Sequence, residues 1–241
     1  MRYPNGKLAL DGVDLTVRAG ELVTILGSNG SGKTTLLRCI VRLQDPTEGQ
    51  VLVGGQDLAG LNGEALREAR LALAMVFQRA NLVRRRSVLA NVASGTLGRR
   101  RTLWTTFGGL PNEELPMAQE LLRKVGVEHL GAQRADTLSG GQAQRAAIAR
   151  ALAQRPKLIL ADEPVASLDP EAAEEIMRLL RQLAVDNGLA VLCVLHQPAL
   201  ALRYSHRVVG LRNGLVAFDL PAPFCDEQQI ALLYKDKDLA A

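Results

Sequence analysis

The sequence predicts an α/β fold in which an open, mainly parallel sheet carries ligand-binding residues at its carboxyl edge. The first observation is a strand-length apolar run at 22–26, followed by a glycine-rich turn and then by a helical pattern at 34–43. The second is that later apolar segments, at 72–78, 157–164 and 190–195, end at polar or charged side chains. Because the carboxyl ends of parallel strands meet at one edge, we expect these side chains to lie close together.

The middle of the chain differs in character from the rest. Residues 79–135 hold two arginine triplets, at 84–86 and 99–101, together with Trp104 and Phe107. Segments with helical periodicity lie at 87–94 and 113–125, and a long, loop-like connection lies at 95–112. We therefore expect one domain of 241 residues, with a sheet core and antiparallel subdomain at 1–78 and 136–220, an inserted helical subdomain at 79–135, and a tail at 221–241.

Short strands are expected around the first part of the sheet. Residues 8–10 are apolar, and residues 13–17 alternate between apolar and polar side chains, which is typical of a half-buried strand. After a break at 45–49, residues 50–56 form a strand with a turn, and residues 62–71 form a short helix. These strands predict a small antiparallel β subdomain.

The second half of the chain alternates helices and strands. Helices are expected at 139–154, which Pro156 terminates, and at 171–186. The type I′ turn signal Asn213-Gly214 predicts a hairpin between 207–211 and 215–218, and a short helix follows at 226–234.

Composition bounds the class of protein. The chain is 47% hydrophobic and 22% charged, which is ordinary for a globular domain, and it has no apolar run of membrane-spanning length or signal-peptide stretch. We expect a cytosolic protein, or one on the cytosolic face of a membrane. The three cysteines are far apart and show no metal spacing, which favours buried reduced thiols.

The net charge of +4 comes mostly from arginine. The triplets Arg84–Arg86 and Arg99–Arg101 leave nucleic-acid binding open as an alternative. Aromatic residues are only 3% of the chain and no base-reading motif is present, so no specific nucleic-acid partner is expected. Contact with phosphate headgroups or with a partner near a membrane is favoured.

The glycine-rich turn fits the phosphate-binding pattern G-x-x-x-x-G-K-[ST]. A strand that leads into such a turn and then into a helix leaves backbone N–H groups directed at one point, where they attract phosphate. Lys33 can reach the β- and γ-phosphates, the Thr34 hydroxyl can bind Mg²⁺, and Thr35 can contact the α-phosphate. The loop comprises Gly27, Ser28, Asn29, Gly30, Ser31, Gly32, Lys33, Thr34 and Thr35.

A second helix start has the same anion-binding character. Ser139 is well placed as an N-cap, and the turn continues through Gly140, Gly141 and Gln142. One chain thus has a single nucleotide loop but two anion-binding helix ends. This mismatch predicts a dimer in which each copy completes the site of the other.

Polar residues at the strand ends supply the expected catalytic chemistry. Asp162 suits Mg²⁺ binding, and its neighbour Glu163 suits polarisation of a water for attack on the γ-phosphate. Gln78 can reach a metal or the attacking water, and His196 can hydrogen-bond the γ-phosphate. A lone glutamine or histidine at such a position is more often structural, so these two assignments depend on the rest of the set.

Taken together, these residues resemble the ATP-binding subunit of ABC transporters over essentially the whole chain. The resemblance implies a P-loop NTPase core, ATP and Mg²⁺ as ligands, and catalytic roles for Glu163, His196 and Gln78. It identifies residues 27–35 with the Walker A loop and 138–142 with the family signature. It also implies that Asp169 belongs to the D-loop and contacts the nucleotide, and that Tyr3 stacks on adenine.

A finer resemblance is to the phosphonate importer subfamily. Its markers include 86–92, 95–98, 134–136, 161–170 and 195–197. This resemblance implies import of phosphonate or phosphite, with a second copy of the chain, two integral membrane permease subunits and a periplasmic or extracellular substrate-binding protein as partners. An importer of another solute and a soluble ABC-type ATPase stay open as alternatives.

The chain departs from these relatives at two places. It starts almost at Tyr3, where most relatives have a strand before the aromatic residue, so the antiparallel subdomain is expected to be less ordered. The segment 197–199 also lacks an acidic residue that relatives often carry.

Overall fold

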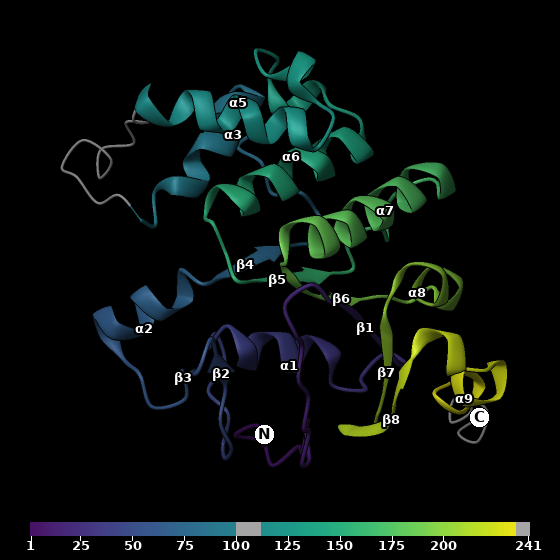
Figure 1. Ribbon diagram of the computed structural model, residues 1–241. Coiled ribbons are helices and arrows are strands. Elements are labelled where there is room, and N and C mark those ends of the chain that lie inside the picture. Colours follow the sequence, from purple (N-terminus) through teal and green to yellow (C-terminus); the bar gives the residue numbers. More distant parts are fainter. Residues whose placement is uncertain (100–111, 235–241) are drawn as a thin grey trace.

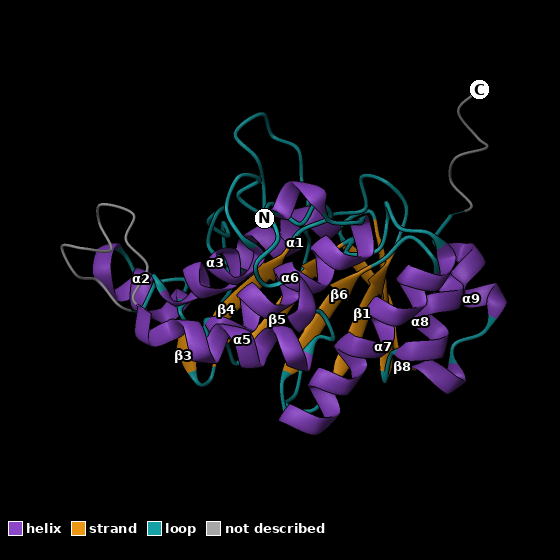
Figure 2. Cartoon of the chain, turned by 90° about the horizontal axis from the view of Figure 1, so that it is seen from above, coloured by secondary structure: helices purple, strands orange, loops and turns teal. Residues whose placement is uncertain are grey.

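A six-stranded sheet organises the computed structural model, which describes residues 1–99 and 112–234 (Figure 1). The strands of this sheet are β1 (Leu22–Leu26), β4 (Leu73–Val76), β5 (Leu158–Asp162), β6 (Ala190–Val194), β7 (Arg207–Arg212) and β8 (Leu215–Pro221). Their order is β4-β5-β6-β1-β7-β8, and only the β7–β8 pair is antiparallel. Figure 2 shows β4, β5, β6 and β1 side by side in this order. The predicted α/β fold is therefore confirmed, and the four strands that end in candidate site residues are neighbours.

Helices cover both faces of the sheet, as Figure 1 shows. The main helices are α1 (Lys33–Ile40), α2 (Gly63–Arg70), α3 (Val88–Ala93), α5 (Leu115–Lys124), α6 (Gly140–Ala153), α7 (Pro170–Asn187), α8 (Pro198–Tyr204) and α9 (Glu227–Leu232). In β1, Leu22 and Leu26 face the core beneath α6 and α7, whereas Val23 and Ile25 face the core beneath α1. Burial on both faces explains why this strand reads as a continuous apolar run.

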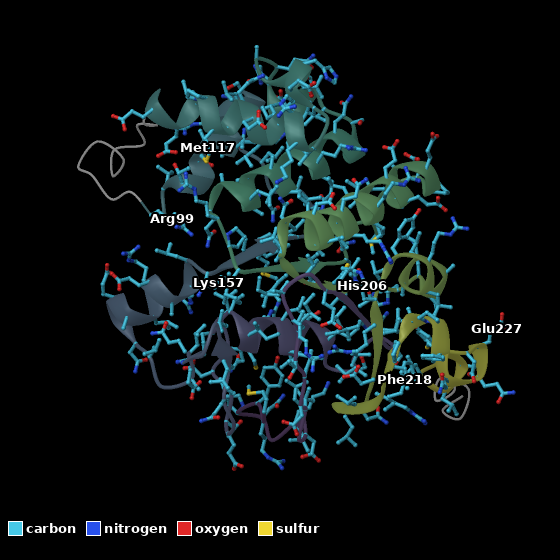
Figure 3. All side chains as sticks on the ribbon, viewed as in Figure 1. Arg99, Met117, Lys157, His206, Phe218 and Glu227 are labelled. Atoms are coloured by element: carbon cyan, nitrogen blue, oxygen red, sulfur yellow. The ribbon has the colours of Figure 1, made fainter. Side chains whose placement is uncertain are left out.

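The helical segments expected in the middle of the chain are present. Ser87 caps α3 by accepting a hydrogen bond from the amide of Ala90, and α5 packs on α3 and α6. The Arg99 side chain bonds to the backbone carbonyls of Gln154 and Arg155, at the position labelled in Figure 3. The rest of that arginine triplet, Trp104, Phe107 and most of the expected 95–112 loop lie outside the described residues. The division into subdomains stays a prediction.

The prediction of strands at 8–10 and 13–17 is wrong, because the structure has no strand in either segment. Leu8 makes a single antiparallel bridge with Arg2, and Asp11 donates its amide to the carbonyl of Gly214 instead of to a strand partner. Alternation reports which side chains are buried, and Val13, Leu15 and Val17 do pack on the core beside α1. A strand also requires a neighbouring segment for backbone hydrogen bonds, and burial of alternate side chains does not provide one. The antiparallel subdomain is reduced to the hairpin of β2 (Leu52–Val53) and β3 (Gln56–Asp57).

The remaining differences are local. Helix α1 ends earlier than expected, because Arg42 adopts a left-handed conformation with φ of 56°. Helix α8 was not expected from the sequence, and Pro198 at its first position fixes a helical φ. The hairpin at Asn213-Gly214 is confirmed, with φ of 49° and 80° at the two turn residues. Within the described parts of the chain, no helix has the length and apolar character needed to cross a membrane.

A histidine at the start of β1 predicts a pH effect on stability. The Leu22 amide donates to His206 Nδ1 over 2.9 Å, and burial, followed by the nearby Arg181 charge, lowers the pKa of His206 (labelled in Figure 3). The fold thus favours the neutral ring, so its contribution to stability is present above the ordinary histidine pKa of about 6.5 and is lost as pH falls.

The variant His206→Asn tests this effect, because its side-chain oxygen can accept the same bond without titrating. Between about pH 7.5 and about pH 5.5, the wild-type melting temperature should fall by roughly 2–4 °C more than that of the variant. Calorimetry of both proteins measures the difference. Equal losses in the two proteins would contradict the role of His206.

Candidate functional site

The phosphate loop is built so tightly that only glycine fits at two positions. A Cβ atom on Gly27 would lie 2.2 Å from the carbonyl oxygen of Leu211. A Cβ atom on Gly32 would lie 2.6 Å from the carbonyl oxygen of Ala9, and Gly32 has a left-handed φ of 110°. The loop therefore approaches two other backbone segments closely, which a side chain at either glycine would prevent.

Lys33 places its ammonium group inside this loop. Its Nζ atom donates to the carbonyls of Gly27 and Ser28 over 2.8 and 3.0 Å, and the residue is 6% exposed. Burial lowers the pKa of Lys33, while the charges of Glu163 and Asp162 oppose that shift. The positive charge is thus held between the loop and the two carboxylates.

The loop also contains a buried polar atom that fits a phosphate ligand. Ser31 is 2% exposed, and its hydroxyl oxygen has no hydrogen-bond partner within the described structure. A buried hydroxyl without a partner is costly, and a phosphate oxygen would satisfy it. Together with the free helix start, which has no side-chain cap at Gly32, this atom indicates that the loop fits a phosphate group.

Residues that follow the loop carry further hydroxyl groups. Thr34 is exposed in the first turn of α1, where its hydroxyl is accessible to a metal ion. Thr35 exchanges a hydrogen bond of 3.0 Å with the Tyr3 hydroxyl. The structure therefore brings Tyr3 to the phosphate loop, although 32 positions separate the two residues in sequence. Stacking of Tyr3 on adenine stays a prediction.

A carboxylate and a histidine meet where β5 and β6 end. The Nε2 atom of His196 lies 2.6 Å from Oε1 of Glu163, and both side chains are only partly exposed. Glu163 adopts a left-handed φ of 50°, which is uncommon for a residue with a side chain and typical of functional sites. Its own amide still bonds to the carbonyl of Val194, so the turn begins directly after that ladder bond.

Asp162 occupies the last position of β5, one residue before Glu163. Burial raises the pKa of the Asp162 carboxyl, and the negative charge of Glu163 adds to that shift. The positive charges of Arg38 and Lys33 oppose it. A nearby cation would stabilise the charged form of this carboxylate, and binding of Mg²⁺ by Asp162, Thr34 and Gln78 stays a prediction.

Gln78 is exposed two residues after the end of β4, at the same sheet edge as Asp162 and His196. The structure thus gathers residues from four neighbouring strand ends, namely the phosphate loop after β1, Gln78 after β4, the two carboxylates at β5 and His196 after β6. Sequence reasoning missed Arg38, whose charge acts on Asp162 from the exposed side of α1.

The second anion-binding helix start has the expected geometry. Ser139 caps α6 by accepting from the amide of Gln142, and the Gln142 side chain accepts from the amide of Ser139, a reciprocal capping box. Ser139 and Gly140 are exposed. Helix α6 packs on the opposite face of the sheet from α1, so the two anion-binding helix ends belong to different layers.

The signature turn packs instead against the segment after β5. Cβ atoms on Gly140 and Gly141 would lie 3.0 Å from Leu168 and 3.2 Å from Ala172. Asp169, expected to contact nucleotide, uses its side chain to cap α7 by accepting from the amide of Ala172. The structure therefore gives Asp169 a local structural role, next to the exposed start of α6.

Comparison with known proteins agrees with this site. A family model described as "ABC transporter" matches residues 10–166. The phosphonates import ATP-binding protein PhnC of Frankia casuarinae is 48% identical, over 97% of this chain and 93% of that protein. The protein of the same name from Alcaligenes faecalis is 44% identical, over 98% of this chain and 86% of that protein.

Solved structures are similar in fold as well. CbiO1 of Clostridium perfringens, described as part of the ABC transporter complex cbiONQ, superposes with a TM-score of 0.82 at 29% identity, over 92% of this chain and 85% of that chain. The ATP-binding cassette MJ0796, solved as a dimer in a post-hydrolysis state with ADP and Pi, gives a TM-score of 0.75 at 36% identity, over 89% and 90% of the two chains.

Proposed function

Because this chain belongs to the ABC transporter family and is an ATPase of that family, we propose that it powers the import of phosphonate, or of a related anion such as phosphite, through a membrane transporter. The relatives named as phosphonate importers span 97–98% of the chain, so the resemblance is not confined to the motifs that the whole family shares. The observation that best supports ATP hydrolysis at this site is that four strands end side by side at one edge of the sheet.

The positions of the side chains at this edge support the following roles. The loop amides and Lys33 hold the β- and γ-phosphates of ATP, and the Glu163 carboxylate orients and polarises a water for attack on the γ-phosphate. His196, 2.6 Å from Glu163, fixes the direction of that carboxylate and reaches the γ-phosphate. Mg²⁺, when bound by Thr34, Asp162 and Gln78, would neutralise charge on the phosphate oxygens.

The two separate anion-binding helix ends support a second copy of the chain as a partner. Two copies of the chain dock head to tail about a two-fold axis, with Ser139 and Gly141 of one copy facing the γ-phosphate held by the other. A dimer solved with ADP and Pi for a protein 36% identical supports this arrangement. The assembly sits on the cytoplasmic face of the membrane, where two permease subunits and an external substrate-binding protein complete the importer.

The segment after Gln78 is the proposed contact with the permease. Phe77 and Val83 are exposed at 37% and 53%, and the exposed arginines Arg84–Arg86 follow them. An apolar pair beside basic residues suits a membrane protein near anionic headgroups. Arg99 bonds to carbonyls of its own chain, which weighs against a role for this one arginine in nucleic-acid binding.

ATPase activity of the assembled transporter tests the proposal. A tagged copy of the chain should co-purify from detergent-solubilised membranes with an integral membrane subunit. In proteoliposomes, the substrate-binding protein loaded with methylphosphonate should raise ATP hydrolysis about 5-fold or more above the rate without it. The same protein offered phosphate or an amino acid should not. Stimulation by another solute alone would favour a different importer, and the absence of any membrane partner would favour a soluble ATPase.

A further inference from the structure

The loop that carries Gln78 is bound by side chains from helix α6. Gln144, which is 2% exposed, donates from Nε2 to the carbonyl of Phe77 over 3.0 Å. Arg150 donates to the carbonyl of Ala80 over 2.7 Å and to that of Asn81 over 2.6 Å. The backbone is therefore attached to α6 on both sides of Gln78.

The two donors lie six positions apart on one helix, which corresponds to about 9 Å along its axis. The carbonyls that they bind are only three to four residues apart, and Asn81 closes the segment with a left-handed φ of 49°. A short loop with such fixed ends has little freedom to move independently of α6. In Figure 1, α6 lies over β4, the strand from which this loop emerges.

The same helix begins at the signature turn. Ser139 caps α6 five residues before Gln144, and both donors belong to the same continuous helix of 14 residues. A displacement of the exposed end of α6 therefore reaches the carbonyls on either side of Gln78 through three direct hydrogen bonds.

We propose that Gln144 and Arg150 are positioning residues, which hold Gln78 in the orientation that reaches the metal of its own chain. This inference rests on the proposed role of Gln78 at the metal. It deepens that role by connecting it to the site that the same chain completes in its partner.

The test measures ATP hydrolysis by the full chain as free Mg²⁺ is varied. Gln144→Met keeps the length and apolar stem of the side chain but removes the donor to Phe77. We expect kcat to fall about 10-fold and the Mg²⁺ concentration for half-maximal rate to rise about 5-fold, because small misplacements of site residues are costly. Binding of ATP in EDTA should stay within about twofold of wild type, since Gln78 has no part in it without metal.

Gln154→Met is the matched control. Gln154 is the same residue type at the C-cap of the same helix, and its Nε2 atom lies 3.1, 3.3 and 2.5 Å from the carbonyls of Arg70, Leu71 and Leu73. These acceptors precede or begin β4, away from Gln78. We expect a comparable loss of thermal stability and an unchanged dependence on Mg²⁺.

Variants of Arg150 keep the test decisive if Gln144→Met does not fold. Arg150→Met should shift the Mg²⁺ dependence as Gln144→Met does, and Arg150→Lys, which retains a charged donor, should recover part of the activity. A shift of equal size in Gln154→Met, or lost stability with unchanged Mg²⁺ dependence in the Gln144 and Arg150 variants, would overturn the inference.

Gln78→Ala separates this inference from the proposed function. If Gln78→Ala leaves the Mg²⁺ dependence unchanged, the proposed role of Gln78 is wrong whatever Gln144 does. If Gln78→Ala is impaired while the Gln144 and Arg150 variants behave normally, the inference alone is wrong.

Discussion

The variant Glu163→Gln should bind ATP normally and hydrolyse it about 100-fold to 1,000-fold more slowly than wild type. Glutamine preserves the size of the side chain, and its amide oxygen still faces His196, which lies 2.6 Å from Oε1 in the native site. It removes the carboxylate charge that polarises the attacking water, so binding and chemistry should separate. Single-turnover hydrolysis measures the chemical step, and titration with a fluorescent ATP analogue measures binding.

The oligomeric state of Glu163→Gln provides a second test of the catalytic role. If hydrolysis opens the dimer, the Glu163→Gln protein should remain dimeric in ATP and Mg²⁺, whereas wild type should return to the monomer as ATP is consumed. Size-exclusion chromatography with light scattering follows the two states. Asp186→Asn, an exposed carboxylate in α7, is the control and should behave as wild type. Normal turnover by Glu163→Gln would remove Glu163 from the catalytic role.

The sheet edge could be predicted from the sequence because its information is local. Each strand run ends at the residue that the site uses, as with Asp162 at the last position of β5. The parallel rule then places those ends together without knowledge of the strand order. The start of the signature helix α6 could also be predicted, because its N-terminal cap depends on residues only three positions apart, Ser139 and Gln142.

The features that could not be predicted depend on hydrogen-bond partners far away in the sequence, which a local sequence pattern does not identify. The alternation in 13–17 correctly reported buried side chains, but hydrogen-bonded pairing requires a neighbour, and none of these residues forms a strand in the structure. The bonds of Gln144 and Arg150 have backbone carbonyls as acceptors, and every residue type offers one. The available signal was a polar residue, Gln144, at a buried position within an alanine-rich helix face.

The pair Glu163–His196 lies between these two cases. The sequence indicated both residues and the edge on which they lie, but not their direct contact or the left-handed backbone of Glu163. That conformation turns the chain sharply after β5, while the preceding residue, Asp162, stays in register with Val194 of β6. Two adjacent carboxylates can therefore serve different purposes, one toward the cation and one toward the water.

The variant Ser139→Arg should bind ATP with an affinity within about twofold of wild type and hydrolyse it more than about 100-fold more slowly. The phosphate loop and α1 lie in a different layer of the chain from the start of α6, so a change at the exposed Ser139 leaves that loop intact. In the dimer, a long cationic side chain would occupy the space that the partner's γ-phosphate needs. Hydrolysis should fail because no complete site forms, and light scattering should show a monomer in ATP even when Glu163→Gln is added to the same chain.

Ser139→Ala separates this effect from the loss of the helix cap. Both variants remove the hydroxyl that accepts from the Gln142 amide, so both should lose about 1 kcal/mol of stability. Only arginine adds bulk and charge, so Ser139→Ala should retain dimerisation and a measurable part of the hydrolysis rate.

Mixing two variants provides the decisive measurement, because a dimer of one Ser139→Arg chain and one Lys33→Ala chain places both defects in the same composite site. The other composite site then keeps an intact phosphate loop and an intact signature turn, so the mixture should regain activity that neither variant has alone. Full inactivity of that mixture, or loss of ATP binding by the Ser139→Arg monomer, would contradict a site shared between two copies.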